Sequence, residues 1–301
     1  MNGFLNIDKP TGRTSSDAVV FVRRRLPKGT AVGHGGTLDP EASGVLPVCV
    51  GSATRLFDYI IDKQKTYVAR IRLGVVTDTQ DATGNVIAQC PVTAGEAELR
   101  AALPRFIGDI LQVPPMYSAL KRDGERLYKL ARKGRSVTLE PRACRVDDIE
   151  YLGCEGDATY ALRIRCGKGV YIRTLCHDIG RALGCGGHML SLRRVAAGIF
   201  DIDSALTLDR VDALAGEGRL GEALIPLDAP LGHLPAVRVG ARSRHAVLNG
   251  NPLRAGWLEA PAPQVEAVRV YLDDEFAGIG APQPNGDVKF RAMLYRPGDG
   301  A

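Results

Sequence analysis

The sequence has 301 residues, of which 45% are hydrophobic and 24% are charged. This composition is typical of a globular protein, and the length suffices for one large and one small domain. The 39 Lys and Arg residues exceed the 34 Asp and Glu residues, which gives a net charge of +5. This excess permits a nucleic-acid partner without requiring one. No segment has the length and apolarity of a membrane-spanning helix, so we expect no membrane association.

The seven cysteines form no Cys-x-x-Cys pair and have no accompanying histidine at zinc-finger spacing. We therefore predict reduced thiols and no metal site. The charged residues Asp8 and Lys9 fall where a signal peptide would be apolar. Together these features predict a cytoplasmic protein.

The first predicted elements are a strand, a helix and a loop. Residues 3–7 have the composition of a strand, and a helix capped by Ser15 or Ser16 is expected to continue to Arg25. Residues 33–44 contain four glycines and a proline. This composition predicts a shaped loop.

Further strands and helices then alternate irregularly. Residues 65–74 and 161–167 alternate apolar and polar side chains, which predicts strands with one wet face. Residues 96–107 and 171–184 have helical periodicity, and residues 188–200 are expected to be extended. This order predicts an α+β fold with a mixed, largely antiparallel sheet flanked by helices.

The chain changes character near residue 227. Three prolines lie between residues 225 and 235, and the segments beyond them are short apolar runs separated by turns such as NGNP and PNGD. We therefore predict a large domain over residues 1–227 and a small all-β domain over residues 228–301.

Seven basic residues lie between Lys121 and Arg135, against only two acidic ones. An isolated run of charge is more often a solvated helix face. This run, however, follows the segment QVPPMYSAL, whose prolines prevent continuous secondary structure. We therefore predict a projecting basic insertion at about residues 112–140 that contacts phosphate groups.

The loop GHGGTLDP, residues 33–40, carries Asp39 directly before Pro40. Glycines let the backbone turn tightly and approach a ligand closely, while the proline fixes the exit geometry. Taken alone, an aspartate before proline in such a loop is as often a turn former as a functional residue. The surrounding sequence has to decide between these interpretations.

The segment GHGGTLDPEASGVLPVCVGSATRL, residues 33–56, resembles the signature of the TruB family of pseudouridine synthases. Four further segments resemble motifs of this family in the expected order, at residues 5–17, 65–84, 112–134 and 166–200. Several ordered motifs make chance a poor explanation. The C-terminal tail resembles a small RNA-binding domain of the PUA type.

The resemblance implies an isomerase that converts uridine 55 in the T-arm loop of tRNA to pseudouridine and uses no cofactor. It implies that Asp39 is the nucleophile, that the flipped uracil stacks on Tyr67, and that Arg173 pairs with the Asp39 carboxylate. It also implies substrate contacts for three other residues: His34, Tyr171 and Leu192. Without the motifs, ordinary roles in the core or in surface ion pairs would be the better interpretation of all of these except Asp39.

The expected reaction suits a single carboxylate. It breaks the N1–C1′ bond of uridine and forms a C5–C1′ bond, and a carboxylate can attack the sugar or the base, or stabilise positive character at C1′. An opposing arginine favours the ionised carboxylate against desolvation. Extrusion of the base costs a few kcal/mol, of which stacking on Tyr67 returns ~1–3 kcal/mol, and His34 can fill the vacated stack.

The resemblance also implies a monomer that binds the T-arm and, by extension, the acceptor stem of tRNA. Two alternatives stay open: a synthase subunit directed by a guide RNA, and a non-catalytic tRNA-binding chaperone. The predicted insertion and the absence of basic tails favour the stand-alone enzyme. A glycosidase is rejected, because Asp39 and Glu41 lie too close in one loop to flank a glycosidic bond.

Overall fold

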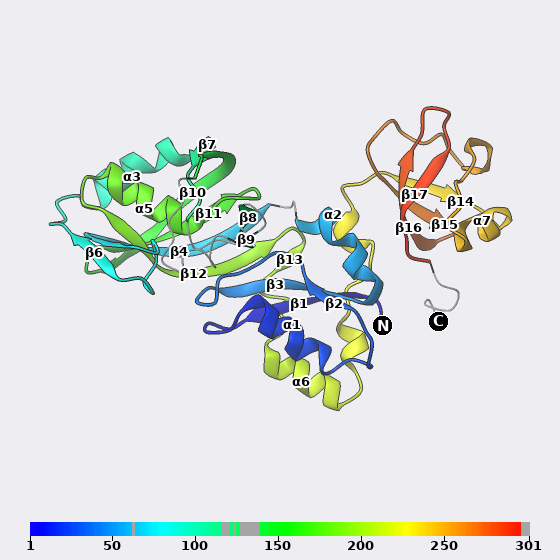
Figure 1. Cartoon of the computed structure of the whole chain (residues 1–301), viewed down its shortest axis with the longest axis horizontal. Coiled ribbons are helices and arrows are strands. Elements are labelled where there is room, and N and C mark those ends of the chain that lie inside the picture. Colours follow the sequence, from blue (N-terminus) through cyan, green and yellow to red (C-terminus); the bar gives the residue numbers. More distant parts are fainter. Residues whose placement is uncertain (62–63, 116–120, 123–124, 127–138, 296–301) are drawn as a thin grey trace.

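The computed structural model describes five ranges of the chain: residues 1–61, 64–115, 121–122, 125–126 and 139–295 (Figure 1). Most of the predicted basic insertion at 112–140 therefore lies outside the described residues. Within it, strand β8 (Lys121–Arg122) pairs antiparallel with strand β9 (Glu125–Arg126).

Nine strands form the main sheet, in the order β1-β3-β12-β4-β11-β10-β7, with β2 added to β3 and β13 added to β12. Their bounds are β1 Gly3–Lys9, β2 Val32–His34, β3 Ser43–Val50, β4 Lys65–Leu73, β7 Gly108–Gln112, β10 Arg142–Gly156, β11 Thr159–Cys166, β12 Gly187–Ala197 and β13 Phe200–Asp201. Strands β3 and β12 run parallel, and the other neighbours run antiparallel. The predicted mixed, largely antiparallel sheet is confirmed.

Helices lie against both ends of this sheet. Their bounds are α1 Ser15–Arg23, α2 Phe57–Ile61, α3 Glu96–Ala102, α5 Ile172–Ala182 and α6 Leu208–Gly216. Short 3-10 turns are η1 Gly51–Leu56, η2 Leu103–Phe106, η3 Leu220–Ala223 and η4 Ala229–Leu231. Helices α1 and α6 lie together near β1, and α3 and α5 lie at the other end (Figure 1). No helix in the described ranges is long and apolar enough to cross a membrane.

Two predicted helices differ from the observed ones in their ends. Helix α1 is capped by Thr14, whose side chain accepts from the Asp17 N–H while Asp17 accepts from the Thr14 N–H at 2.8 Å. Ser15 and Ser16 are therefore the first two residues of the helix, and neither is the predicted cap. The helix predicted over residues 96–107 ends as α3 at Ala102 and continues as η2, which contains Pro104.

A two-stranded ribbon projects from the same end of the sheet as α3. It consists of β5 (Val75–Thr77) and β6 (Val86–Gln89), which pair antiparallel. The loop between them, residues 78–85, contains Asp81, which forms an ion pair with Arg173.

The C-terminal part of the chain forms a separate sheet of order β14-β15-β16-β17. Its strands are β14 Ala236–Val239, β15 Val268–Leu272, β16 Glu275–Pro282 and β17 Val288–Met293. The expected C-terminal β domain is thus confirmed, although it is not all-β. Helix α7 (Arg244–Leu248) and the 3-10 turns η5 (Ala241–Ser243) and η6 (Ala255–Trp257) lie between β14 and β15.

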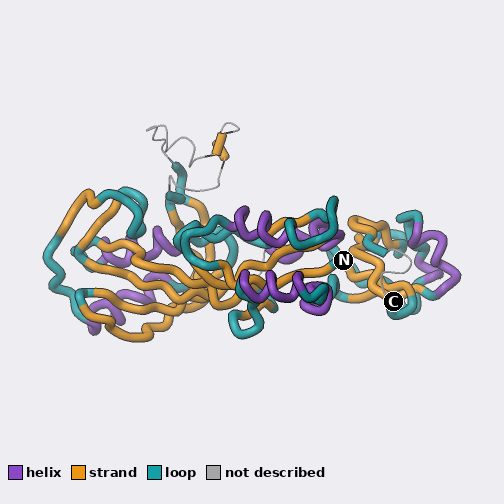
Figure 2. The backbone as a smooth tube through the Cα atoms, turned by 90° about the horizontal axis from the view of Figure 1, so that it is seen from below, coloured by secondary structure: helices purple, strands orange, loops and turns teal. Residues whose placement is uncertain are grey.

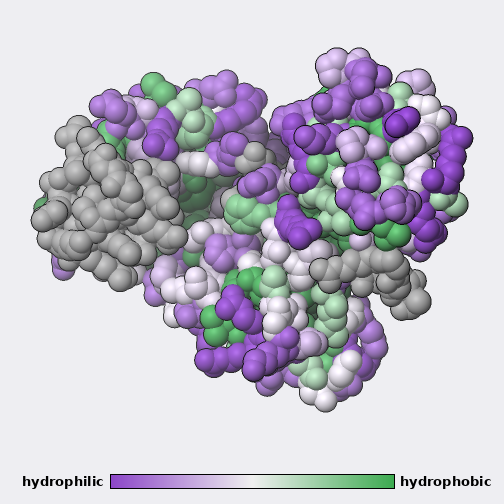
Figure 3. Space-filling view, turned by 45° about the vertical axis from the view of Figure 1, so that its right-hand side comes forward, coloured by the Kyte–Doolittle hydropathy of each residue, from purple (hydrophilic) through white to green (hydrophobic). Residues whose placement is uncertain are grey.

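Both sheets share one hydrophobic cluster at their junction. Ile279 and Leu294 of the C-terminal part pack in a cluster with Phe4 and Leu56 of the main part. The strands of the main sheet run along the long axis of the molecule, with the C-terminal part at one end (Figure 2). Hydrophilic side chains cover much of the C-terminal part on the face shown in Figure 3. The predicted boundary at residue 227 stays a prediction.

Candidate active site

The loop that carries Asp39 runs from β2 to β3, and the N-terminal segment fixes its backbone. The Ser15 hydroxyl donates to the Leu38 carbonyl at 3.1 Å and accepts from the Leu38 N–H at 2.9 Å. On the other side of Asp39, the Lys9 ammonium donates to the Pro40 carbonyl at 3.1 Å. The residues directly before and after Asp39 are therefore held in place by the motif at residues 5–17.

Lys9 is completely buried beneath this loop. Its ammonium also donates to the carbonyls of Pro10 and Arg13, at 2.8 and 2.6 Å. Burial lowers the pKa of Lys9 to about 8, against the opposing effect of the Glu41 and Asp39 charges. Lys9 therefore stays mainly protonated at neutral pH and can satisfy three carbonyls at once.

The Arg173 guanidinium binds two carboxylates from distant parts of the chain. Its Nε lies 3.1 Å from Asp39 Oδ2, and its Nη1 lies 3.3 Å from Asp81 Oδ2. The Arg173 side chain is only 6% exposed, whereas that of Asp39 is 41% exposed and that of Asp81 is 15% exposed. Arg173 is thus a buried link between the two, and Asp39 is the carboxylate that faces open space.

Burial raises the pKa of Asp39 above its usual 3.8, and the negative charge of Asp81 adds to this rise. The positive charges of Arg173 and Lys9 act in the opposite direction, Arg173 more strongly. Arg173 therefore is the principal group that keeps Asp39 ionised in a site that otherwise favours the protonated acid.

Asp81 was not among the predicted site residues. Its Oδ1 accepts from Thr79 Oγ1 at 2.7 Å, from the Thr83 N–H at 3.0 Å and from Thr83 Oγ1 at 2.6 Å. Such a pattern of hydroxyl residues around an aspartate is typical of a turn. The sequence signal was therefore ambiguous, and only the fold brings Asp81 to Arg173.

Tyr67 lies in β4 directly opposite Arg194 in β12. Arg194 is 1% exposed, and its guanidinium donates to the carbonyls of Val45 at 2.6 Å and Gly36 at 3.2 Å. It also hydrogen bonds with the Tyr67 side chain, although burial is the larger influence and raises the pKa of Tyr67. Arg194 thus connects the Asp39 loop to the aromatic ring, and it too was missed by the sequence interpretation.

Gly44 permits the close approach of β3 to β12 at this point. Its φ is +102°, a conformation that favours glycine, and a side chain there would collide with the backbone of Arg194. The close packing of β3 against β12 therefore explains why a glycine stands at the end of the predicted loop.

The other predicted residues take different places around the site. His34 is half-buried in β2, and burial and the charge of Arg194 lower its pKa, so its imidazole is neutral at pH 7. Leu192 is buried two positions before Arg194 in β12, on the same face of the sheet, and belongs to the same hydrophobic cluster as Tyr67. Tyr171 is the N-cap residue of α5, the helix that carries Arg173.

Thus Asp39, Tyr67 and Arg173 lie around one site, with His34 and Leu192 on neighbouring strands. Their roles in catalysis and substrate binding stay predictions. A partly open carboxylate that is paired with a buried arginine, in a loop connected by Arg194 to the strand of a buried aromatic ring, can perform nucleophilic chemistry on a flat, apolar-faced group such as a base.

Comparison with known proteins finds similar sequences over almost the whole chain. Residues 23–172 match the family described as TruB family pseudouridylate synthase, N-terminal domain, and residues 173–232 match the tRNA pseudouridylate synthase B C-terminal domain. The tRNA pseudouridine synthase B of Stutzerimonas stutzeri is 45% identical, over 98% of this chain and 96% of that protein. The protein of the same name from Aromatoleum aromaticum is 44% identical, over 98% of this chain and 93% of its own length.

Two solved structures have a similar fold. One is a chain of an H/ACA RNP bound to a substrate RNA containing 2′-deoxyuridine, with a TM-score of 0.74, 27% identity, and coverage of 98% of this chain and 85% of that one. The other is a chain of a Cbf5-Nop10-Gar1 complex, with a TM-score of 0.71, 30% identity, and coverage of 94% and 79%. The extent and level of the sequence matches show that this chain belongs to the TruB family of pseudouridine synthases.

Proposed function

We propose that this chain isomerises uridine 55 in the T-arm loop of tRNA to pseudouridine, with Asp39 as the nucleophile. The observation that carries the proposal is the ion pair between Arg173 and Asp39, 3.1 Å long, in the loop whose Gly36 carbonyl accepts from Arg194, the residue opposite Tyr67. The names of the sequence relatives support tRNA as the substrate.

The reaction is an isomerisation, so uridine and pseudouridine have the same composition. The ionised Asp39 acts as the nucleophile in the step that breaks the N1–C1′ bond. The freed uracil then turns, and its C5 bonds to C1′. The proton on C5 then leaves to solvent, N1 takes up a proton, and the base regains its aromatic form. Arg173 holds the Asp39 carboxylate ionised and oriented throughout, which is the positioning that a planar guanidinium supplies well.

The remaining residues bind the flipped nucleotide. The uracil stacks on Tyr67, and Leu192 and Tyr171 contact it or its sugar. His34, which is neutral at pH 7, fills the stack that the uridine leaves. Stacking on an aromatic ring is worth ~1–3 kcal/mol, enough to offset much of the cost of extrusion.

The rest of the tRNA is bound by two further elements. The basic insertion at about residues 112–140 contacts phosphates of the T-arm, and the C-terminal domain, residues 228–301 and of PUA type, extends the contact toward the acceptor stem. We propose that the enzyme acts as a monomer in the cytoplasm and needs no cofactor, because the carboxylate alone supplies the chemistry.

A guide-directed synthase subunit is the second candidate. It is favoured by the structural likeness to chains of an H/ACA RNP and of a Cbf5-Nop10-Gar1 complex. Against it, those chains are 27–30% identical to this one, whereas the proteins named tRNA pseudouridine synthase B reach 45%.

Release of tritium from tRNA labelled at C5 of uridine tests the proposal, because the C5 hydrogen must leave. The purified chain alone, with no guide RNA and no other protein, is expected to release one tritium per tRNA. Activity that appears only after a guide RNA and partner proteins are added would favour the second candidate. Tight binding of tRNA without any release would favour a non-catalytic chaperone.

A further inference from the structure

We infer that Gln112 is a positioning residue of the active site, which sets the start of helix α5 through the backbone of Tyr171. The inference rests on the proposed function, because it concerns the same reaction. Gln112 is the last residue of β7, and only 3% of it is exposed. Its side-chain amide contacts the backbone of Tyr171, the N-cap residue of α5, so we infer that it acts through the helix and not on the substrate.

The side-chain amide of Gln112 makes a two-point contact with the Tyr171 backbone. The Tyr171 N–H donates to Oε1 at 3.0 Å, and Nε2 donates to the Tyr171 carbonyl at 3.3 Å. The Cys144 thiol donates to the same Oε1 at 3.6 Å. These partners fix the orientation of the amide, because a flipped amide would place its NH2 group against two donors. Gln112 thus pairs with Tyr171 much as a neighbouring strand would.

Tyr171 is the residue at which helix α5 begins. Its carbonyl also accepts the helical hydrogen bond from the Leu175 N–H at 3.0 Å, and its side chain makes no capping bond. Arg173 follows two positions later, in the first helical turn. A movement of Tyr171 therefore moves the Arg173 guanidinium relative to Asp39, and a misplacement of about 1 Å can cost ~100-fold in rate.

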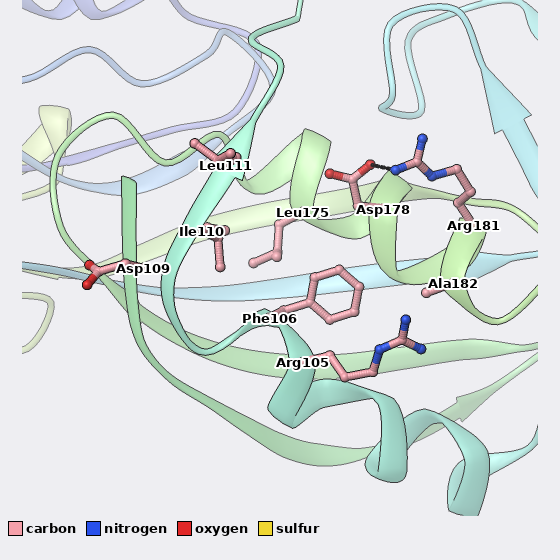
Figure 4. Close-up of a pocket in the computed structure, with 9 residues that line it drawn as sticks. All are labelled: Arg105, Phe106, Asp109, Ile110, Leu111, Leu175, Asp178, Arg181 and Ala182. Carbon is pink, nitrogen blue, oxygen red and sulfur yellow. Dashed lines mark ion pairs between the residues drawn. The ribbon is translucent and has the colours of Figure 1, made fainter. Parts of the chain in front are cut away.

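Further along, residues of η2, β7 and α5 line an open pocket of about 500 Å³ (Figure 4). Ile110 of β7 lines one side, and Leu175 and Asp178 of α5 line the other. The two elements do not fill this space with side chains. Ile110 packs against the hydrophobic cluster that contains Leu175, so apolar packing and the polar contact at Gln112 together join β7 to α5.

Replacement of Gln112 by methionine tests the inference, because Gln112→Met keeps the length of the side chain and removes both bonds to Tyr171. We expect the single-turnover rate constant to fall about 10- to 100-fold, while the dissociation constant for tRNA changes by less than about threefold. The matched control is Val211→Ala, which creates a cavity in the buried face of α6. It is expected to lower the melting temperature without slowing the reaction.

A double variant separates positioning from general loss of structure. If Gln112 acts through Arg173, Gln112→Met should slow the Arg173→Lys enzyme by less than about threefold. Gln112→Glu, which keeps the acceptor for the Tyr171 N–H and loses the donor, serves if the methionine variant does not fold, and should also slow single turnover.

The inference is overturned if either variant turns over at the wild-type rate, if the loss is as large in the Arg173→Lys background, or if Val211→Ala slows the reaction equally. Each outcome presupposes an active wild-type enzyme. A wild-type chain that releases no tritium from tRNA would instead reject the proposed function, so the two failures are distinguishable.

Discussion

The two carboxylates that bind Arg173 lie in regions of very different construction. Asp81 sits in the turn between β5 and β6, where three donors from Thr79 and Thr83 occupy its Oδ1. Asp39 sits in a loop whose neighbouring backbone is fixed, but its own side chain is 41% exposed, against 15% for Asp81. Asp81, which already accepts three hydrogen bonds, thus holds Arg173 in place. Arg173 in turn pairs with Asp39, whose side chain is the more exposed of the two.

Replacement of Asp39 is expected to have the largest effect on the reaction rate. Asp39→Asn keeps the size of the side chain and removes the nucleophilic charge, so we expect turnover to fall by at least ~10⁴-fold. Affinity for tRNA should stay within a few-fold, because most of the interface lies elsewhere. Multiple turnover by a pure preparation of this variant, seen by tritium release, would show that the open carboxylate is not the nucleophile.

Arg173→Lys should have the next largest effect. The ammonium keeps the charge, yet a point charge cannot reach both Asp39 and Asp81 as the planar guanidinium does. We expect single turnover to slow by ~100-fold or more at saturating enzyme. A rate near that of the wild type would mean that Arg173 supplies only charge and that its geometry is unimportant.

Asp81→Asn should slow the reaction less, by about 10- to 100-fold, because the amide retains an oxygen for the Thr79 and Thr83 donors but replaces the charged Oδ2 acceptor of Arg173 with an NH2 group. The matched control is Asp78→Asn in the same turn. Asp78 accepts from the Asn85 backbone and side chain. Equal losses in the two variants would indicate that the fold of the turn matters and not the pairing with Arg173.

The smallest predicted effect is a shift in pH dependence. Asp39 must be ionised, and burial raises its pKa above 3.8, so the single-turnover rate should fall in acid with a midpoint above that value. The charge of Asp81 contributes to the rise. Asp81→Asn should therefore move the midpoint to lower pH even though the variant is slower. A midpoint that moves upward instead would contradict the assigned coupling, provided circular dichroism shows that the protein stays folded.

The sequence was sufficient for the elements with strong local patterns. The alternation over residues 65–74 predicted β4, and the glycine-rich segment predicted the loop around Asp39. The predicted ends of two helices were wrong, because other local interactions determine where these helices begin or end. Thr14 and not Ser15 caps α1, since Ser15 is engaged with Leu38, and the helix predicted over residues 96–107 changes to a 3-10 turn at Pro104.

Several residues of the candidate site were not predicted from the sequence, for a different reason. Asp81 meets Arg173 across 92 positions, and Arg194 meets Val45 across 149. Both residues lie within segments that resemble family motifs, residues 65–84 and 166–200, but their partners are distant in sequence, so no local pattern predicts these contacts. Lys9 also lies within such a segment, and its contact with the Pro40 carbonyl depends on the pairing of β1 with β3. Only the fold reveals which of many polar residues surround Asp39.

The central claim, that Asp39 of this chain makes pseudouridine 55 in tRNA, is tested most directly by mapping pseudouridine in cellular tRNA. Cells that lack the gene should have unmodified uridine at position 55. A plasmid copy of the wild-type gene should restore the modification, and the Asp39→Asn copy, expressed at the same level, should not. Pseudouridine that persists at position 55 in the deletion strain, or that returns with Asp39→Asn, would contradict the account.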